Sequence, residues 1–350
     1  MNDIDKQTFG KSLIASFLHA VFYLLVIFSS IWLCLALWIH QPFGRWFTYA
    51  AIIFWITLSL SLTGIYITQA IFKRKTDVII YLVCFTFALI WFFSMPPRND
   101  RDWNPEVAKI LDYQQQGQQI TIENVRNFTW HTEDQYDIHW ETRHYDLSKL
   151  QSMDLILSYW AGDKIAHTLV SFMFSDGQVL SFSIEIRKEK HESFSSIGGF
   201  FRQYELAIVP ADEKDIIFTR SNIRNERVYI YPVKMPKIDM QELFLSYLQQ
   251  GKNLQTEPRW YNTIFSNCTT IIFDMVNHIE PVPVDIRMLL SGLLPSYLYD
   301  HNQLSHQYSL AQWQQMAFIN PKVKDFNHNK DQSSQNFSRL IRSGLPQSSP

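Results

Sequence analysis

The sequence is poor in cysteine, and its three cysteines are too few and too scattered for a disulfide framework. Cys34 and Cys84 lie within long apolar segments, where a thiol usually behaves as a small buried hydrophobic group. Cys268 is the one thiol left in the more polar part of the chain. Such a cysteine is bonded to another chain, buried and inert, or a nucleophile.

Net charge and phosphate- or metal-binding motifs are also scarce. The formal charge of the 350 residues is −2, so no strong field selects nucleic acid or an acidic partner. The chain has no glycine loop that could hold phosphate and no ligand spacing typical of zinc. His131, His139 and His144 lie among carboxylates, in a pattern more typical of a polar strand-and-loop surface. We therefore expect no metal, no cofactor and no nucleic-acid partner.

Charged residues are rare in the first third of the chain, which contains three apolar runs. The runs cover about residues 13–39, 47–72 and 78–95. A helix needs about 20 apolar residues to cross a bilayer, and the first two runs exceed this length. A cleaved signal peptide would have a much shorter apolar core. The sequence therefore predicts a membrane domain, residues 1–96, with three transmembrane helices.

Basic residues predict the orientation of these helices. Lys73, Arg74 and Lys75 follow the second run, whereas the loop after the first run has only Arg45. Because basic loops stay on the cytoplasmic side, the N-terminus is expected in the cytoplasm and the rest of the chain outside. In a bacterial inner membrane that side is the periplasm.

The remaining residues are divided by composition. We expect a proline-rich polar linker over residues 97–119, a globular domain over 120–320 and a polar tail over 321–350. Within the domain, a helix is expected from Asp239, as N-cap, to Gly251, as C-terminal stop. The apolar segment 288–299 fits either a helix packed in the core or one that dips into the bilayer.

A β-hairpin is predicted around Asp176 and Gly177. A three-residue loop, residues 175–177, places Val170 opposite Phe182 and keeps apolar and polar side chains on separate faces. A two-residue loop would instead set Val170 against a serine. Since a shift of one residue moves every side chain to the other face, we prefer the three-residue loop.

This register has a consequence for chemistry. It places His167 directly opposite Glu185, about 5 Å apart at Cβ, so that the carboxylate can orient the imidazole. Without this pairing, His167 would be an ordinary strand histidine and Glu185 a partner for a basic side chain.

Cys268 follows Ser266 and Asn267, two residue types that favour the N-cap of a helix. The thiol is then expected in the first helical turn, where the helix dipole favours the thiolate. A thiolate, a histidine base and an orienting carboxylate are the layout of thiol acyl-transfer sites. Backbone N–H groups of the first turn, with Asn267 and Thr269 in support, could stabilise an oxyanion.

Five segments resemble, in this order, the DUF4105 family, which is named after the N-terminal periplasmic domain of Lnb, a bacterial lipoprotein N-acyltransferase. The segments lie within about residues 120–300 and read NVRNFTW, AHTLVSFMF, SFSIEIRKE, YELAIVPADEKDIIFTRSNIRNERVYIYPV and WYNTIFSNCTT. The resemblance implies an α+β domain of the papain-like, permuted NlpC/P60 type, with an antiparallel sheet and a cysteine-bearing helix.

The resemblance also implies residue roles. The family's thiol corresponds to Cys268 and its histidine to His167, with Glu185 where a third, orienting residue would lie. Tyr261 and Arg187, within the matching segments, are candidate substrate-site residues.

For Lnb-type members the implied reaction moves an acyl chain from a phospholipid to the thiol, and then to the α-amine of a lipoprotein. In that acyltransferase the domain precedes the membrane helices, whereas here three apolar runs come first.

Three functions remain open from the sequence. The first is an acyltransferase that acts on lipid or lipoprotein substrates through a Cys268 thioester. The second is a cysteine peptidase or amidase of the cell envelope with the same catalytic geometry. The third is a membrane-anchored binding domain with a structural cysteine.

Overall fold

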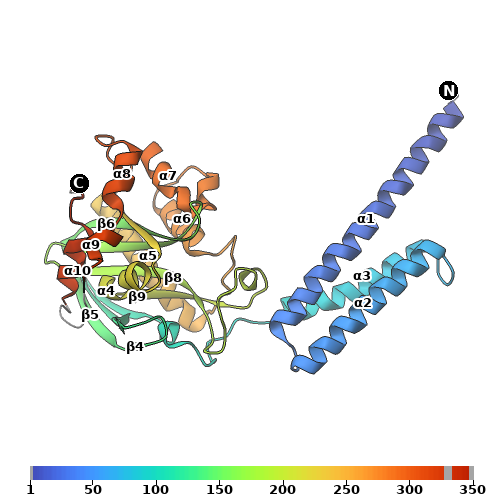
Figure 1. The fold of residues 1–350 in the computed structure, drawn as a ribbon, viewed down its shortest axis with the longest axis horizontal. Helices are drawn as coiled ribbons and strands as arrows, with labels where there is room; N and C mark the ends of the chain where they lie inside the picture. Colours follow the sequence, from blue (N-terminus) through green and yellow to red (C-terminus); the bar gives the residue numbers. More distant parts are fainter. Residues whose placement is uncertain (1–2, 327–332, 347–350) are drawn as a thin grey trace. The chain divides into compact units, whose positions relative to one another are not determined.

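The computed structural model describes residues 3–326 and 333–346. It divides into two compact units, one up to Pro97 and one from Arg98 onward. The first unit consists of three helices, α1 (Asp3–His40), α2 (Arg45–Thr68) and α3 (Arg74–Phe93) (Figure 1). Each is long and apolar enough to cross a membrane, which confirms the three predicted apolar helices. The second ends at Thr68, earlier than the apolar run, because Gln69 adopts a left-handed conformation.

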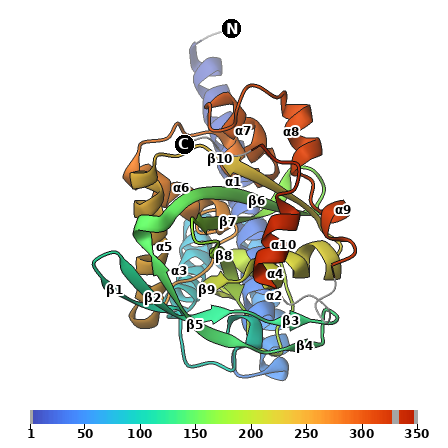
Figure 2. The same cartoon turned by 90° about the vertical axis from the view of Figure 1, so that its left-hand side faces the viewer.

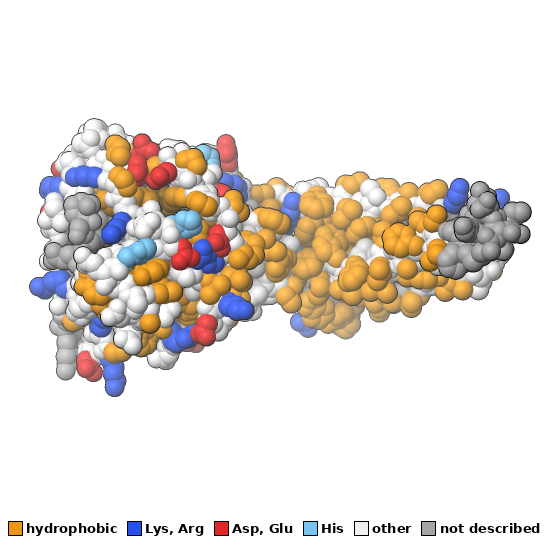
Figure 3. Space-filling model, turned by 90° about the horizontal axis from the view of Figure 1, so that it is seen from above, with side chains coloured by type: hydrophobic (Ala, Val, Ile, Leu, Met, Phe, Trp, Pro, Cys, Tyr) orange, Lys and Arg blue, Asp and Glu red, His pale blue; other side chains and the backbone are white. Residues whose placement is uncertain are grey.

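The outward side chains of these helices are largely apolar, as the space-filling view shows (Figure 3). Polar side chains between the helices find partners instead. The Tyr81 hydroxyl lies 2.7 Å from Ser29 Oγ, and Trp55 Nε1 donates to Ser30 Oγ at 3.1 Å. Interhelical hydrogen bonds of this kind help helices to associate in a membrane. The hydrophobic effect contributes little there, because lipid tails are as apolar as the side chains.

The second unit is built on one mixed sheet, with strand order β1-β2-β9-β8-β7-β6-β10 and β5 paired to β2. All its ladders are antiparallel except the short β2–β9 contact. The strands are β1 (Asp112–Gln116), β2 (Gln119–Arg126), β5 (Trp140–Asp146), β6 (Leu150–Ala161), β7 (Ile165–Phe174), β8 (Val179–Arg187), β9 (Glu205–Ala211) and β10 (Arg227–Val233), with a separate ribbon of β3 (Thr129–Trp130) and β4 (Tyr136–Asp137).

Helices cover both faces of this sheet (Figure 2). Val170 and Phe172 of β7 point into a core shared with α5 and α6, whereas Leu169 points into a second core with α4 and α10. Side chains that alternate between the two faces of the strand thus contribute to both hydrophobic cores. The helices are α4 (Glu213–Phe218), α5 (Lys237–Thr256), α6 (Cys268–Ile279), α7 (Leu294–Asp300), α8 (Leu310–Ala317), α9 (Asn320–Val323) and α10 (Ser334–Ile341). The mixed helix-and-sheet class predicted from the sequence is confirmed.

The β7–β8 hairpin has the predicted register. Val170 pairs with Phe182, and Phe174 and Gln178 close a three-residue loop through a 3.0 Å hydrogen bond. Gly177 has a φ of 84°, a value that side chains of other residues rarely tolerate.

The expected linker and the expected polar tail both pack against the second unit. Trp103, in the expected linker, is buried beneath the guanidinium of Arg187, and β1 begins at Asp112. In the expected polar tail, α10 packs into the second core, because Phe337 and Ile341 lie four residues apart on one helical face and are fully buried.

The helix α5 is longer than predicted at both ends. It begins after Pro236, so Asp239 lies in the first turn and is not the N-cap. Gly251 lies inside the helix and does not end it. A Cβ atom there would come within 2.1 Å of the buried Leu111 side chain, so glycine permits close packing of α5 against the chain before β1.

A buried ion pair joins α4, in the second core, to the end of strand β2. Asp215 of α4 accepts hydrogen bonds from Arg126 Nε at 2.8 Å and NH2 at 3.0 Å. It also accepts from the Phe128 N–H and from Trp130 Nε1. Removing one partner of such a pair leaves an uncompensated buried charge.

We expect Asp215→Asn to lower the free energy of unfolding by about 3 kcal/mol or more, because it leaves the Arg126 charge unpaired. The same change at the exposed Asp163, which pairs with Arg227, is the matched control and should have little effect. Denaturant unfolding of the detergent-solubilised protein measures both. Equal stability of the two variants would contradict a structural role for the Asp215 pair.

Candidate active site

The position of Cys268 is fixed by the N-terminal cap of α6. Asn267 Oδ1 accepts hydrogen bonds from the N–H groups of Thr269 and Thr270, at 2.8 and 3.0 Å. The Thr270 hydroxyl in turn accepts from the Asn267 N–H at 2.9 Å, which completes a capping box. Cys268 is therefore the first residue of the helix, as predicted, and it is buried.

The thiol lies where the sheet opens. The β7–β8 ladder ends at the Leu169–Ser183 pair, although β7 stays paired with β6 to Ile165 and β8 stays paired with β9 to Arg187. Beyond that pair the backbone N–H of Thr168 no longer faces a carbonyl of β8. It is directed at the Cys268 sulfur instead and helps to lower the pKa of the thiol.

His167 lies on the other side of this opening and contacts the predicted carboxylate. Its Nε2 is 3.4 Å from Glu185 Oε1, so the pairing inferred from the hairpin register brings these two side chains together. The Ser183 hydroxyl bridges them, at 2.7 Å from His167 Nε2 and 2.6 Å from Glu185 Oε1. Because Nε2 is engaged in this way, Nδ1 is the nitrogen left to serve the thiol.

The charges at this site stabilise one another. Burial alone would lower the pKa of His167, but the Glu185 carboxylate and the Cys268 thiolate raise it to about 9. Burial alone would raise the pKa of the Cys268 thiol, but the adjacent imidazolium lowers it. His167 and Arg220 together hold the pKa of Glu185 well below its usual range, against the effect of burial. The favoured state is a thiolate–imidazolium pair.

Sequence reasoning missed two members of this network, Ser183 and Arg220. Arg220 NH2 donates to Glu185 Oε1 at 2.7 Å, and NH1 donates to the Ile216 carbonyl at 3.1 Å. It comes from a single π-helical turn, Thr219–Ile223, that follows α4 and has no sequence signature. Ser183 lies two residues from Glu185 on the same strand face, so strand alternation could have found it.

The two predicted oxyanion supports have other tasks. The side-chain N–H₂ of Asn267 donates to the Thr263 carbonyl at 2.8 Å, and its oxygen caps the helix, so this amide is not a free donor. The Thr269 hydroxyl pairs with that of Thr168 at 3.0 Å and lies 3.9 Å from the sulfur. Within the described part of the chain, the N–H of Cys268 itself has no acceptor. It is the best backbone donor for an oxyanion here.

The two predicted substrate-site residues, Arg187 and Tyr261, have different surroundings in the structure. Arg187 is buried, and its guanidinium donates to the carbonyls of Val107 and Ala108 and to Asn99 Oδ1, which makes it a structural anchor. Tyr261 remains near the thiol. Burial raises the pKa of its hydroxyl, and the negative charges of Cys268 and Glu185 raise it further, so it stays a neutral hydrogen-bond donor.

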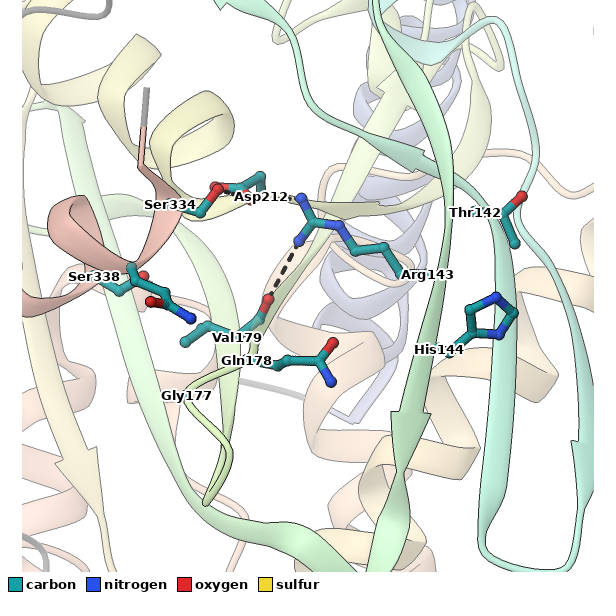
Figure 4. A pocket seen from close by; sticks show the side chains of 10 residues that line it. Thr142, Arg143, His144, Gly177, Gln178, Val179, Asp212, Ser334 and Ser338 are labelled. Atoms are coloured by element: carbon teal, nitrogen blue, oxygen red, sulfur yellow. Dashed lines mark hydrogen bonds and ion pairs between the residues drawn. The ribbon is translucent and has the colours of Figure 1, made fainter. Parts of the chain in front are cut away.

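A hollow of about 380 Å³ lies away from the thiol, between β5, the β7–β8 hairpin loop and α10 (Figure 4). Arg143 crosses it, but its charge is already paired with Asp212 at 2.5 Å and with Glu141. Ser334 also donates to Asp212, at 2.6 Å. Since these charges satisfy one another, the hollow is not a second reaction centre.

The three histidines near this strand do not converge. His131 contacts Asp137 at 3.1 Å, His139 contacts Glu141 at 3.2 Å, and His144 contacts Thr121 at 3.0 Å. Among the residues that the structure describes, no group of three or more potential ligands could hold a metal ion.

Residues 136–292 match the family model of the Lnb N-terminal periplasmic domain. The matched region contains His167, Glu185 and Cys268, and the predicted family resemblance is confirmed over these residues. Together with the three apolar helices, this match supports a membrane-associated protein with a periplasmic domain. Comparisons with curated proteins and with solved structures gave no significant match.

The ion pair predicts a pH profile for thiol reactivity. With Cys34 and Cys84 changed to serine, we expect iodoacetamide to alkylate Cys268 at a lower pH than an ordinary thiol, because the adjacent imidazolium lowers the pKa of the Cys268 thiol and stays protonated up to the His167 pKa of about 9. His167→Ala removes the cation, so burial dominates and alkylation should require alkaline pH. Intact-protein mass spectrometry measures both profiles. Coincident profiles would contradict the ion pair.

Ser183→Ala should lower the pKa of His167 by on the order of one unit, because a hydrogen bond to a charged group is lost while the 3.4 Å contact with Glu185 remains. The matched control is Ser181→Ala, on the same strand face, whose hydroxyl pairs with Ser171. Titration of the histidine signals by NMR measures the shift. An equal response of the two variants would remove Ser183 from the network.

Proposed function

We propose that this protein is a membrane-anchored periplasmic acyltransferase that acts on lipid or lipoprotein substrates through a Cys268 thioester. One observation carries the proposal: a buried thiol at a helix N-terminus, beside a histidine that contacts a carboxylate. The family match agrees with this chemistry.

The first half of the reaction forms the thioester. The Cys268 thiolate attacks the carbonyl carbon of an acyl ester, and the developing oxyanion faces the Cys268 N–H. The imidazolium of His167 then gives its Nδ1 proton to the leaving alcohol oxygen as the C–O bond breaks. Neutral His167 is left beside the thioester.

The second half returns the site to its starting state. His167 accepts a proton from an incoming amine, which attacks the thioester carbon and forms an amide bond. The C–S bond breaks and the thiolate is restored beside the imidazolium. Glu185 orients the ring and stabilises its charge in both halves, and Arg220 keeps Glu185 ionised.

The surroundings of the thiol support a lipid substrate. Phe265, three residues before Cys268, is 79% exposed, and Ile264 beside it is 38% exposed. A hydrogen bond from Thr263 to the Ser196 carbonyl joins this turn to the loop that carries Ile197, which is 53% exposed. Exposed apolar side chains on neighbouring loops suit contact with a membrane surface.

The proposed topology follows from the charges around the helices. The basic residues at 73–75 favour a cytoplasmic connection between α2 and α3, with the N-terminus on the same side of the membrane. The inner membrane would then hold α1, α2 and α3, with the second unit on the periplasmic side.

We expect the purified protein, incubated with phospholipid vesicles, to gain the mass of one acyl chain on Cys268, released by hydroxylamine. Cys268→Ala should abolish the adduct. The control Cys84→Ser should retain it, because Cys84 lies in a membrane helix.

The acceptor decides between the open functions. Transfer of the chain to an added N-terminal cysteine peptide would support the acyltransferase, and release of free fatty acid alone would indicate a hydrolase. Absence of an adduct with every lipid donor, in protein that still binds vesicles, would contradict the acyltransferase and leave the peptidase or amidase and the binding domain with a structural cysteine.

A further inference from the structure

An apolar cavity of about 100 Å³ lies between α6 and the sheet, on the side of the first core. Its walls come mainly from β6, β7, α5, α6 and α7, and most of the lining side chains are apolar, with Asp239, Glu280 and Gln303 among the exceptions. Leu294 and Tyr297 of α7 contribute and are buried, so the apolar segment near residue 294 packs into the core. The proposed mechanism leaves this cavity unused.

The cavity reaches the two threonines that contact the thiol. Thr168 and Thr269 line one end of it, and their hydroxyls hydrogen-bond to each other at 3.0 Å. Thr269 Oγ1 is 3.9 Å from the Cys268 sulfur, and the Thr168 N–H is directed at the same sulfur. A group bound covalently to the sulfur therefore lies at the entrance of an apolar space.

The cavity then follows one face of α6 along its length. The side chains that line it recur at helical spacing: Thr269, Ile272, Val276 and Ile279, with Glu280 after them. At 1.5 Å per residue this stretch of helix is about 16 Å long. One leaflet of a bilayer has about 15 Å of hydrocarbon, half of the ~30 Å core, and this is the length occupied by one lipid acyl chain.

We propose that this cavity binds the alkyl chain of the acyl group carried on Cys268. The proposal rests on the proposed function and adds the site that selects a long-chain donor over a short one. The resting cavity of about 100 Å³ is smaller than the ~150 Å³ apolar cavity that binds benzene, so it holds only a short piece of an alkyl chain. The unbranched side chains of Met153 and Met235 in its wall can move to admit the rest.

The test uses the full-length protein in detergent and p-nitrophenyl esters of acetate and dodecanoate. Each ester acylates the thiolate as its C–O bond breaks and p-nitrophenolate leaves. Val276→Phe fills the middle of the cavity, and the matched control Asn277→Phe adds the same ring to an exposed position of the same helix. Intact-protein mass spectrometry gives the rate of thioester formation for each pair.

We expect the unaltered protein to form the dodecanoyl thioester at least about tenfold faster than the acetyl thioester, because the cavity buries the added methylene groups. Val276→Phe should slow dodecanoyl transfer about tenfold and leave acetyl transfer unchanged, whereas Asn277→Phe should change neither. Acylation without a chain-length preference, or an equal response of the two variants, would overturn the cavity proposal and leave the thiol chemistry intact. No thioester from either ester would overturn the proposed function.

A second measurement does not need acyl transfer. In Cys268→Ala protein, a dodecanoic acid with a terminal photoreactive diazirine should crosslink to the C-terminal half of α6 or to α7, as peptide mapping would show. Crosslinks confined to the membrane helices would contradict the proposal even if Val276→Phe failed to fold.

Discussion

The chemistry of this protein depends on the point where β7 and β8 stop pairing. Each strand keeps its other neighbour, so the sheet remains intact on both sides of the opening. The opening frees the Thr168 N–H from the ladder and gives the Cys268 sulfur access to His167. A continuous ladder would keep the helix on one face of the sheet and the histidine on the other.

This arrangement requires buried charges. Because positive and negative charges lie side by side, their attraction offsets the cost of removing them from water. Cys268 and Glu185 contribute negative charge, and His167 and Arg220 contribute positive charge. Each anion has an adjacent cation, which is the condition for charges to persist in a poorly hydrated interior. Loss of Arg220 would leave His167 as the only cation beside Glu185 and would stabilise the charged form of the imidazole further. The arginine therefore affects the strength of the base without contacting the sulfur.

The sequence predicted the parts of this site that depend on local rules. Hairpin register placed His167 beside Glu185, and cap chemistry placed Cys268 at the helix start, because both follow from neighbouring residues. Arg220 could not be predicted, since its position depends on a π turn set by tertiary packing. Arg187 was misassigned because a charged residue on a catalytic strand looks functional until its buried carbonyl partners are known. The role of Gly251 and the packing of α10 into the second core could not be predicted for the same reason, as both depend on distant contacts.

The ion pairs of Arg342 bear on the order in which the second unit is completed during synthesis. This guanidinium forms two hydrogen bonds to Glu213 and one to Asp154, and both carboxylates are buried. Arg342 leaves the ribosome 129 residues after Glu213, so the two acids have no such partner in the nascent chain. Neutralisation of these two buried carboxylates therefore has to wait for Arg342, the residue that directly follows α10. The docking of α10 on the sheet is thus coupled to the charge balance of the second core.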